Sequence, residues 1–208
     1  MQDIVIVGAG GFGRETLDVI VALNAETPTW NVLGVVDDAP SQDNLSRLSA
    51  LDVPYLGRVD DSPAGVAVAV AIGSPWARNK VANALANGGH EFPALVHPSS
   101  VIGSEFCHGE GLIVLGGASV GTNVHLGDHV HINAHAVIGH DSRILDFVSL
   151  NPNATVSGDC TIGTGTLLGA SCTILQQISV GANATVGAAS CVVHDVKQGQ
   201  VVKGVPAK

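Results

Sequence analysis

Residues 120–138 read VGTNVHLGDHVHINAHAVI, and this stretch decides the fold because an aliphatic residue returns at every sixth position. The same register runs from Ile102 to Val192, and fifteen of its sixteen positions are aliphatic. The following position is glycine in nine of the sixteen repeats, and the position two residues before the aliphatic one is usually small. A period of six predicts a triangular parallel β-helix, in which each repeat forms one short strand and one corner.

In such a β-helix three repeats form one coil, so residues 18 apart in the sequence stack in neighbouring coils. We expect the aliphatic side chain to point inward, the small residue to fit near the corner, and the glycine to tolerate the turn geometry. Sixteen repeats give a little over five coils. A solenoid covers its edges only in part, which favours self-association.

The residues before the repeat follow a different pattern, typical of a small α/β unit. Apolar runs predict strands at 4–7, 32–36 and 66–72, and helical spacing predicts helices at 14–23 and 78–86. Residues 39–52 are polar, and there we expect a loop with at most one helical turn. The predicted domains are an N-terminal Rossmann-like head over 1–95 and a β-helix over 96–208.

Composition and charge exclude several classes of protein. A net charge of -9 argues against nucleic acid as a partner, because phosphate backbones require a basic surface. The longest apolar run, 66–72, is too short to span a bilayer, and the N-terminus runs into a strand without a signal peptide. The four cysteines lack CxxC spacing, so we expect buried, reduced thiols and a cytoplasmic location.

Three motifs together resemble a known family. The repeat and the final GVPAK (204–208) resemble the hexapeptide-repeat acyltransferases. The motifs GAGGFGRE (8–15) and IGHD (138–141) narrow the resemblance to the nucleotide-sugar N-acetyltransferase and sialic acid O-acetyltransferase group, over the whole chain. This resemblance implies a left-handed parallel β-helix, a homotrimer with sites between subunits, acetyl-CoA as co-substrate, and a nucleotide-linked 4-amino sugar as acceptor for surface glycans.

The IGHD motif supplies the candidate catalytic residues. In the similar proteins a histidine followed by an acidic residue acts as general base, which His140 and Asp141 match. Imidazole suits this task because it titrates near neutral pH, and a carboxylate can fix its tautomer. Gly158 lies 18 residues after His140, one coil along, so its backbone N–H is a candidate donor to the thioester oxygen. We expect direct attack without an acyl-enzyme.

The chain departs from the family pattern at two positions. Similar proteins usually carry a second active-site histidine nine residues after the base, where this chain has Ser149. His131, one coil below Ser149, is a possible replacement. Relatives often have histidine where this chain has Phe12. These departures leave the acceptor open between an amine and a hydroxyl.

The glycine-rich turn predicts a nucleotide site in the head. It matches G-x-G-x-x-G between a strand and a helix, as in NAD-binding proteins, but some 95 residues are too few for both halves of a dinucleotide fold. The resemblance implies that the turn binds the sugar nucleotide, with two aspartates at the base or ribose and a further loop lining the cleft. The candidate residues are Gly8, Gly10, Gly11, Phe12, Gly13, Asp37, Asp38, Gly73 and Ser74.

Coenzyme A is expected along the outer groove between neighbouring β-helices. Gly158 is one candidate contact. Only four basic residues lie in the repeat region, and Lys203 and Lys208 are the candidates for phosphate binding.

The histidines between His125 and His140 raise the alternative of a metal site. Residues must lie 18 apart to stack, and none of these five do. The β-helical carbonic anhydrases use two histidines five residues apart plus a third two coils earlier, where this chain has Ser99 or Ser104. We therefore predict no metal. The remaining hypotheses are N-acetylation of a nucleotide-linked amino sugar, O-acetylation of a sugar hydroxyl, and a non-catalytic ligand-binding scaffold.

Overall fold

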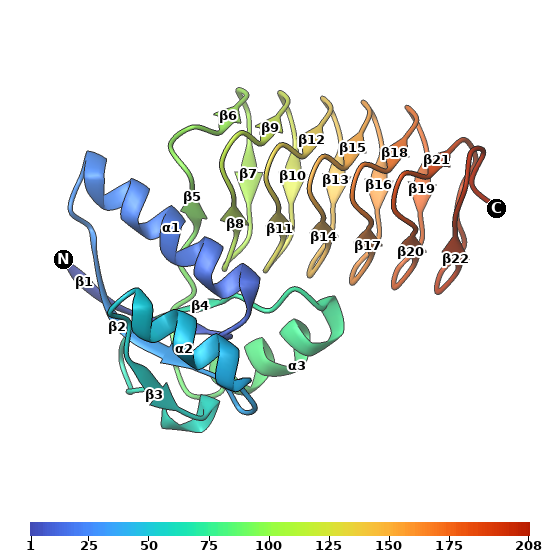
Figure 1. Cartoon of the computed structure of the whole chain (residues 1–208). Helices are drawn as coiled ribbons and strands as arrows, with labels where there is room; N and C mark the ends of the chain where they lie inside the picture. Colours follow the sequence, from blue (N-terminus) through green and yellow to red (C-terminus); the bar gives the residue numbers. More distant parts are fainter.

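The structure, a computed structural model, describes residues 1–208 and places an α/β head beside one end of a β-helix (Figure 1). The head contains four parallel strands in the order β3-β2-β1-β4. Its elements are β1 (Gln2–Val7), α1 (Gly11–Glu26), β2 (Trp30–Val36), α2 (Gln42–Ala50), β3 (Tyr55–Gly57), the 3-10 turn η1 (Val59–Asp61), β4 (Ala67–Val70) and α3 (Pro75–Ala86).

Alternation along β1 explains how both faces of the sheet are covered. Ile4 and Ile6 pack with residues of α1 and α2 on one face, and Val5 and Val7 pack with residues of α3 on the other. All four are essentially inaccessible, as expected for a central parallel strand. The first cluster also includes Leu95, Ile113 and Leu115, so the head and the β-helix share one core.

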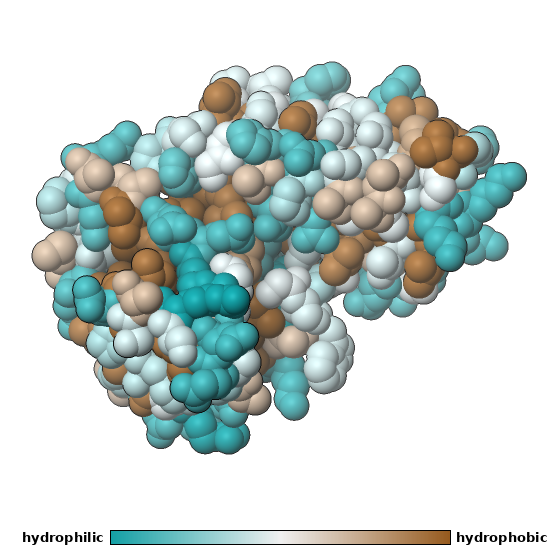
Figure 2. All heavy atoms as spheres, viewed as in Figure 1, coloured by the Kyte–Doolittle hydropathy of each residue, from teal (hydrophilic) through white to brown (hydrophobic).

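The predicted loop at 39–52 is wrong, because this segment contains the nine-residue helix α2. Ser41 caps its N-terminus by accepting a hydrogen bond from the backbone N–H of Asn44 at 3.2 Å. Leu48 is the only residue of α2 that is buried, so the hydrophobic period is too sparse to read from the sequence. The outer faces of α1 and α2 carry hydrophilic side chains (Figure 2).

The β-helix is built from two-residue strands in three stacked parallel sheets of five, seven and six strands. The five-stranded sheet contains β7 (Cys107–His108), β10 (His125–Leu126), β13 (Arg143–Ile144), β16 (Thr161–Ile162) and β19 (Ser179–Val180). The seven-stranded sheet contains β5 (Leu95–Val96), β8 (Ile113–Val114), β11 (His131–Ile132), β14 (Ser149–Leu150), β17 (Leu167–Leu168), β20 (Thr185–Val186) and β22 (Val201–Val202). The six-stranded sheet contains β6 (Val101–Ile102), β9 (Ser119–Val120), β12 (Val137–Ile138), β15 (Thr155–Val156), β18 (Thr173–Ile174) and β21 (Cys191–Val192).

Strand pairing confirms the predicted register. Each strand in the repeat pairs with the one 18 residues away, as Val137 does with Ser119 and Thr155. The aliphatic positions from Val114 to Val192 all point into one core, and so do the small residues two positions earlier, such as Ala118 and Cys172. The fold is therefore a left-handed β-helix, whose thin core explains why aromatic residues are so few.

The role predicted for the repeat glycines needs a correction. The left-handed corner residue lies three positions after the aliphatic one and is rarely glycine, as at Asn123, Asp141 and Phe147, with φ of 56°, 60° and 58°. The glycines directly after the aliphatic residue serve close packing instead. A Cβ on Gly139 would lie 2.5 Å from the backbone nitrogen of Gly158 in the next coil. These glycines let the coils approach, and the corners tolerate several residue types.

One buried arginine joins the two parts of the chain. Arg78 of α3 is fully buried and donates hydrogen bonds to the carbonyl oxygens of Ile72 in the head and of His129 and Phe147 in the β-helix, at 2.7–2.9 Å. Burial lowers the pKa of Arg78 to about 9. No helix of the chain is long and apolar enough to cross a membrane.

Candidate active site

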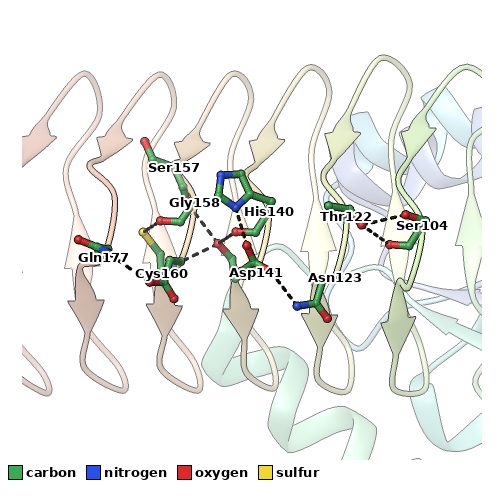
Figure 3. Close-up of polar contacts among 11 residues, drawn as sticks. Ser104, Thr122, Asn123, His140, Asp141, Ser157, Gly158, Cys160 and Gln177 are labelled. Atoms are coloured by element: carbon green, nitrogen blue, oxygen red, sulfur yellow. Dashed lines mark hydrogen bonds and ion pairs between the residues drawn. The ribbon is translucent and has the colours of Figure 1, made fainter.

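His140 and Asp141 lie together at a corner of the β-helix, between β12 and β13 (Figure 3). Nδ1 of His140 is 2.6 Å from Oδ2 of Asp141. Because the carboxylate only accepts, Nδ1 carries the proton and Nε2 is left with a free lone pair. Both side chains are about half exposed. The arrangement is that of a general base oriented by an acid.

Gly158 occupies the next coil directly above the imidazole. A Cβ at this position would lie 2.6 Å from Nε2 of His140, so only glycine leaves space at the basic nitrogen. The backbone N–H of Gly158 donates to no other group of the chain. The structure therefore brings together a lone pair and a free N–H donor, which is the pair that acyl transfer requires.

Two side chains that point into the β-helix, those of Ser142 and Cys160, stabilise the backbone of the His140 corner. The hydroxyl of Ser142 is fully buried, donates to the carbonyl oxygen of Ser157 at 3.1 Å, and accepts from the backbone N–H of Cys160 at 3.2 Å. The thiol of Cys160 donates to the carbonyl oxygen of Leu175 at 3.1 Å. These contacts tie three successive coils together under the site (Figure 3).

A pocket of about 490 Å³ opens over the pair, and no hydrophobic residue lines it. It includes Asp159 and two glutamines that the sequence analysis did not single out. Its residues are His140, Asp141, Gly158, Asp159, Gln176 and Gln177. Two carboxylates and no Lys or Arg give the pocket a negative potential, which favours a cationic group over an anionic one.

The charge of Asp141 is stabilised by two hydrogen bonds. Nδ2 of Asn123 donates to Oδ1 of Asp141 at 2.7 Å, while Nδ1–H of His140 donates to Oδ2. The Asn123 hydrogen bond, followed by that of His140, lowers the pKa of Asp141. Asp141 is therefore ionised at any pH at which the imidazole can act as a base.

The predicted nucleotide-binding residues gather at the carboxyl ends of the head strands. Gly8 follows β1 with φ of 114°, and a Cβ on Gly13 would collide with the carbonyl oxygen of Gly8, so both positions require glycine. Gly10 and Gly11 have open space beside them. Gly73 follows β4 and also has open space beside it. In parallel α/β sheets this edge is where ligands bind.

The three polar side chains predicted to bind the nucleotide, those of Asp37, Asp38 and Ser74, already accept hydrogen bonds from backbone N–H groups of the head. Asp37 accepts hydrogen bonds from the backbone N–H groups of Ala9 and Ala39, at 2.8 and 2.9 Å, and so fixes the glycine-rich turn. Asp38 accepts from the backbone N–H of Val59 at 3.1 Å. Ser74 caps α3. These residues shape the carboxyl edge of the head sheet, and Asp38 is the more exposed of the two aspartates.

His131 and Ser149 lie under the head rather than beside His140. They pair across neighbouring strands and are 1% and 2% exposed. Ser149 donates to the carbonyl oxygen of Gly73 at 3.1 Å, and His131 stacks on Phe12 with ring centroids 4.4 Å apart. Of the five histidines from His125 to His140, only His131 and His129 are buried, and His129 is 5% exposed.

The His140 corner and the head lie on opposite sides of the β-helix. His140 lies between the six-stranded and the five-stranded sheets, whereas the head packs on the outer face of the seven-stranded sheet through His131 and Ser149. In a triangular prism, the corner between two faces is opposite the third face. One chain therefore does not bring the predicted nucleotide cleft to its own His140.

Lys203 and Lys208 lie side by side at the far end of the β-helix. Their backbones exchange two hydrogen bonds, of 3.1 and 3.2 Å. They follow β22, three strands beyond β14 in the same sheet, which places them roughly 15 Å from the coil of His140. A coenzyme A contact there requires an extended ligand along the β-helix.

The four cysteines differ in exposure and contacts, and Sγ of Cys107 lies 2.7 Å from Nδ1 of His125. All four cysteines are free; Cys160 and Cys172 are buried, whereas Cys107 is exposed, contrary to expectation. Burial raises the pKa of Cys172 to about 12, so this thiol is inert. The chain contains no group of three or more metal-ligating side chains.

The fold and this corner resemble those of the hexapeptide-repeat acetyltransferases. Residues 3–85 match the family model of the PglD N-terminal domain. A GDP-perosamine N-acetyltransferase of Escherichia coli O157:H7 is 28% identical over 138 residues, which are 63% of this chain and 59% of that relative. The aligned part of this chain thus spans about three fifths of the length of the curated relative it matches.

Solved structures match the entire chain. PerB from Caulobacter crescentus, in complex with CoA and GDP-perosamine, is 27% identical with a TM-score of 0.88, covering 100% of this chain and 97% of its own. The acetyltransferase domain of PglB from Neisseria gonorrhoeae FA1090, in complex with acetyl coenzyme A, is 26% identical with a TM-score of 0.85, covering 100% and 98%. These comparisons confirm the resemblance to acetyl-CoA-dependent acetyltransferases of nucleotide-linked amino sugars.

Sequence reasoning missed the residues that stack above and below His140 and Asp141 in the neighbouring coils. Asn123 and Asp159 lie 18 residues before and after Asp141, and Gln177 lies a further coil along, so the period itself could have found them. Arg78 carries no such signal, because most of its partners belong to the β-helix and its position depends on how the head docks.

Proposed function

We propose that this chain is an acetyl-CoA-dependent N-acetyltransferase that acts on the 4-amino group of a nucleotide-linked sugar. The observation that carries the proposal is the His140–Asp141 contact of 2.6 Å, with Nε2 facing the space left open by Gly158. The comparisons support this class of reaction, and GDP-perosamine is the first candidate acceptor because two similar proteins are named for it.

In the proposed reaction the acceptor amine attacks the thioester carbonyl of acetyl-CoA. Nε2 of His140 takes the proton that the amine loses as the new C–N bond forms. Asp141 stabilises the resulting imidazolium, and the free N–H of Gly158 donates to the developing oxyanion. The C–S bond then breaks, and coenzyme A leaves as the thiol after protonation.

The charge of the pocket supports an amine rather than a hydroxyl as the acceptor. An amino sugar reaches the site largely as the ammonium form, which Asp141 and Asp159 attract, and it loses one proton to solvent before the neutral amine attacks the thioester. A hydroxyl acceptor carries no charge and gains no such attraction from the two carboxylates. O-acetylation therefore has less support from the structure, although the base and the N–H donor would serve it equally.

A complete site requires a second copy of the chain. The head cleft of one chain and its own His140 face opposite sides of the β-helix. We propose a homotrimer in which the head of one subunit presents the sugar nucleotide to His140 of its neighbour. Acetyl-CoA and nucleotide sugars are cytoplasmic metabolites, and the free cysteines are compatible with that compartment.

The test is a thiol-release assay with acetyl-CoA and a panel of GDP-, UDP- and dTDP-linked 4-amino sugars, each beside its 4-hydroxy counterpart. Release with one amino sugar alone supports the proposal and identifies the nucleotide. Release only with hydroxyl acceptors would replace N-acetylation by O-acetylation. No release with any acceptor, together with no coenzyme A binding by calorimetry, would support a scaffold without catalytic activity.

A further inference from the structure

The left-handed corner that holds Asp141 continues as a column of polar side chains. Asn123, Asp141, Asp159 and Gln177 lie 18 residues apart, with φ between 56° and 62°. Within the column an amide lies beside each carboxylate. Asn123 donates to Asp141 at 2.7 Å, and Gln177 donates to Asp159 at 3.5 Å (Figure 3).

The orientation of the Asn123 amide follows from its partner. An ionised carboxylate only accepts hydrogen bonds, so the NH₂ group and not the carbonyl of Asn123 faces Oδ1 of Asp141. The other oxygen of Asp141 accepts from Nδ1–H of His140. The carboxylate is therefore held at both oxygens, and rotation about its χ angles would break one of the two contacts.

We propose that Asn123 is a positioning residue for the acetyl transfer, fixing Asp141 so that Asp141 fixes the tautomer and ring orientation of His140. This inference rests on the proposed function. A half-exposed carboxylate without a second partner is free to leave the imidazole for water, and each departure removes the stabilisation of the imidazolium. The same hydrogen bond favours the ionised form of Asp141.

The fold itself does not require an amide at this corner. Equivalent corners carry His135, Phe147 and Ala189 at φ of 55–58°. Asn123 is exposed, and its side chain makes no hydrogen bond other than the one to Asp141. The amide thus has no structural partner except a member of the proposed catalytic pair.

The experiment compares Asn123→Ala with Asn153→Ala in the full chain. Asn153 has φ of 59°, is exposed and makes no side-chain hydrogen bond, so its substitution places alanine in the same backbone conformation without touching the site. A hydrogen bond to a charged group contributes about 1.5–3 kcal/mol, so kcat should fall about tenfold or more in Asn123→Ala. The KM for acetyl-CoA and the activity of Asn153→Ala should not change.

Two further readouts separate positioning from a structural effect. The acid limb of the pH profile of kcat/KM should move to lower pH in Asn123→Ala, because a loosened Asp141 supports the imidazolium less. In the Asp141→Ala background, Asn123→Ala should have no further effect on kcat. An equal loss in both backgrounds, or equal activity of the two asparagine variants, would overturn the inference. An inactive wild type would refute the proposed function instead.

Discussion

Arg78 donates a hydrogen bond from Nη2 to Oγ of Ser149 at 3.0 Å, and the same hydroxyl donates a hydrogen bond to the carbonyl oxygen of Gly73 at 3.1 Å. Nη1 of Arg78 also lies 3.0 Å from Nδ1 of His131. No carboxylate pairs with this buried guanidinium; backbone and side-chain acceptors surround it instead. Ser149 therefore connects the β-helix to the loop of the head that contains Gly73.

Replacing Arg78 with methionine should destabilise the chain by about 3 kcal/mol or more. The substitution keeps much of the volume but leaves several buried acceptors without a donor, and each costs about 1–3 kcal/mol. Urea unfolding followed by circular dichroism measures the change. Arg47→Met is the control, because Arg47 is exposed and its side chain makes no hydrogen bond or ion pair. Equal midpoints for the two variants would contradict this account of the junction.

Acidification should loosen the same junction. Burial, with a contribution from Arg78, lowers the pKa of His129 to about 4 and holds the pKa of His131 well below its usual value. An unfolded histidine titrates near 6.5, so the unfolded state binds more protons below that pH. The free energy of unfolding should therefore fall as the pH drops from about 6.5 to about 4, by up to about 1.4 kcal/mol per pH unit for each histidine.

The variant His129→Phe separates the contribution of His129 to this pH dependence from that of His131. The ring of His129 lies between Phe92 and Phe147, and Phe147 already occupies the equivalent corner one coil along, so phenylalanine suits the position. Unfolding free energies at pH 7.5 and pH 5 should differ less in this variant than in the wild type. If the two differences are equal, His129 does not titrate in the way that its burial implies.

The sequence predicts the structure well where the structure follows from a repeating pattern of residues along the chain. The six-residue repeat predicts the strand register from Ile102 to Val192, and the IGHD motif and the 18-residue step predict that His140, Asp141 and Gly158 meet. It was uninformative for α2, whose one buried leucine gives no periodic signal. It also could not show that His129 and His131 are buried, because the docking of the head, and not the repeat, covers them.

Substituting His140 with alanine should lower turnover by about 10²–10⁴-fold, the usual effect of losing a general base. The β-helix and any coenzyme A site should remain intact, because the side chain is exposed and its only hydrogen bond is to Asp141. His135→Ala is a matched control at an exposed corner of the same coil. Turnover above about a tenth of the wild-type rate, with coenzyme A binding unchanged by calorimetry, would remove His140 from the base role.

Adding a single methyl group at Gly158 should reduce activity more than stability. In Gly158→Ala the Cβ would meet Nε2 and Cε1 of His140 at 2.6 and 2.7 Å, so the imidazole must turn away from the acceptor. The exposed ring can move at small cost to the fold, so the unfolding midpoint should shift little while kcat falls by a hundredfold or more. A variant with near-normal kcat would show that the space beside Nε2 is not where the acceptor binds.

Asp159→Asn should weaken the binding of an amino sugar without removing the base. The side chain keeps its size and lines the pocket near Gln177, but the pocket loses one of its two negative charges. The KM for the amino sugar should rise about tenfold, the KM for acetyl-CoA should stay constant, and the effect should shrink at high ionic strength. Asp146→Asn is the control for net charge. Asp146 follows β13 of the five-stranded sheet, and its carboxylate does not line the pocket. Equal KM values in the two variants would mean that the acceptor amine does not use Asp159, and the charge argument for N-acetylation over O-acetylation would then lose its support.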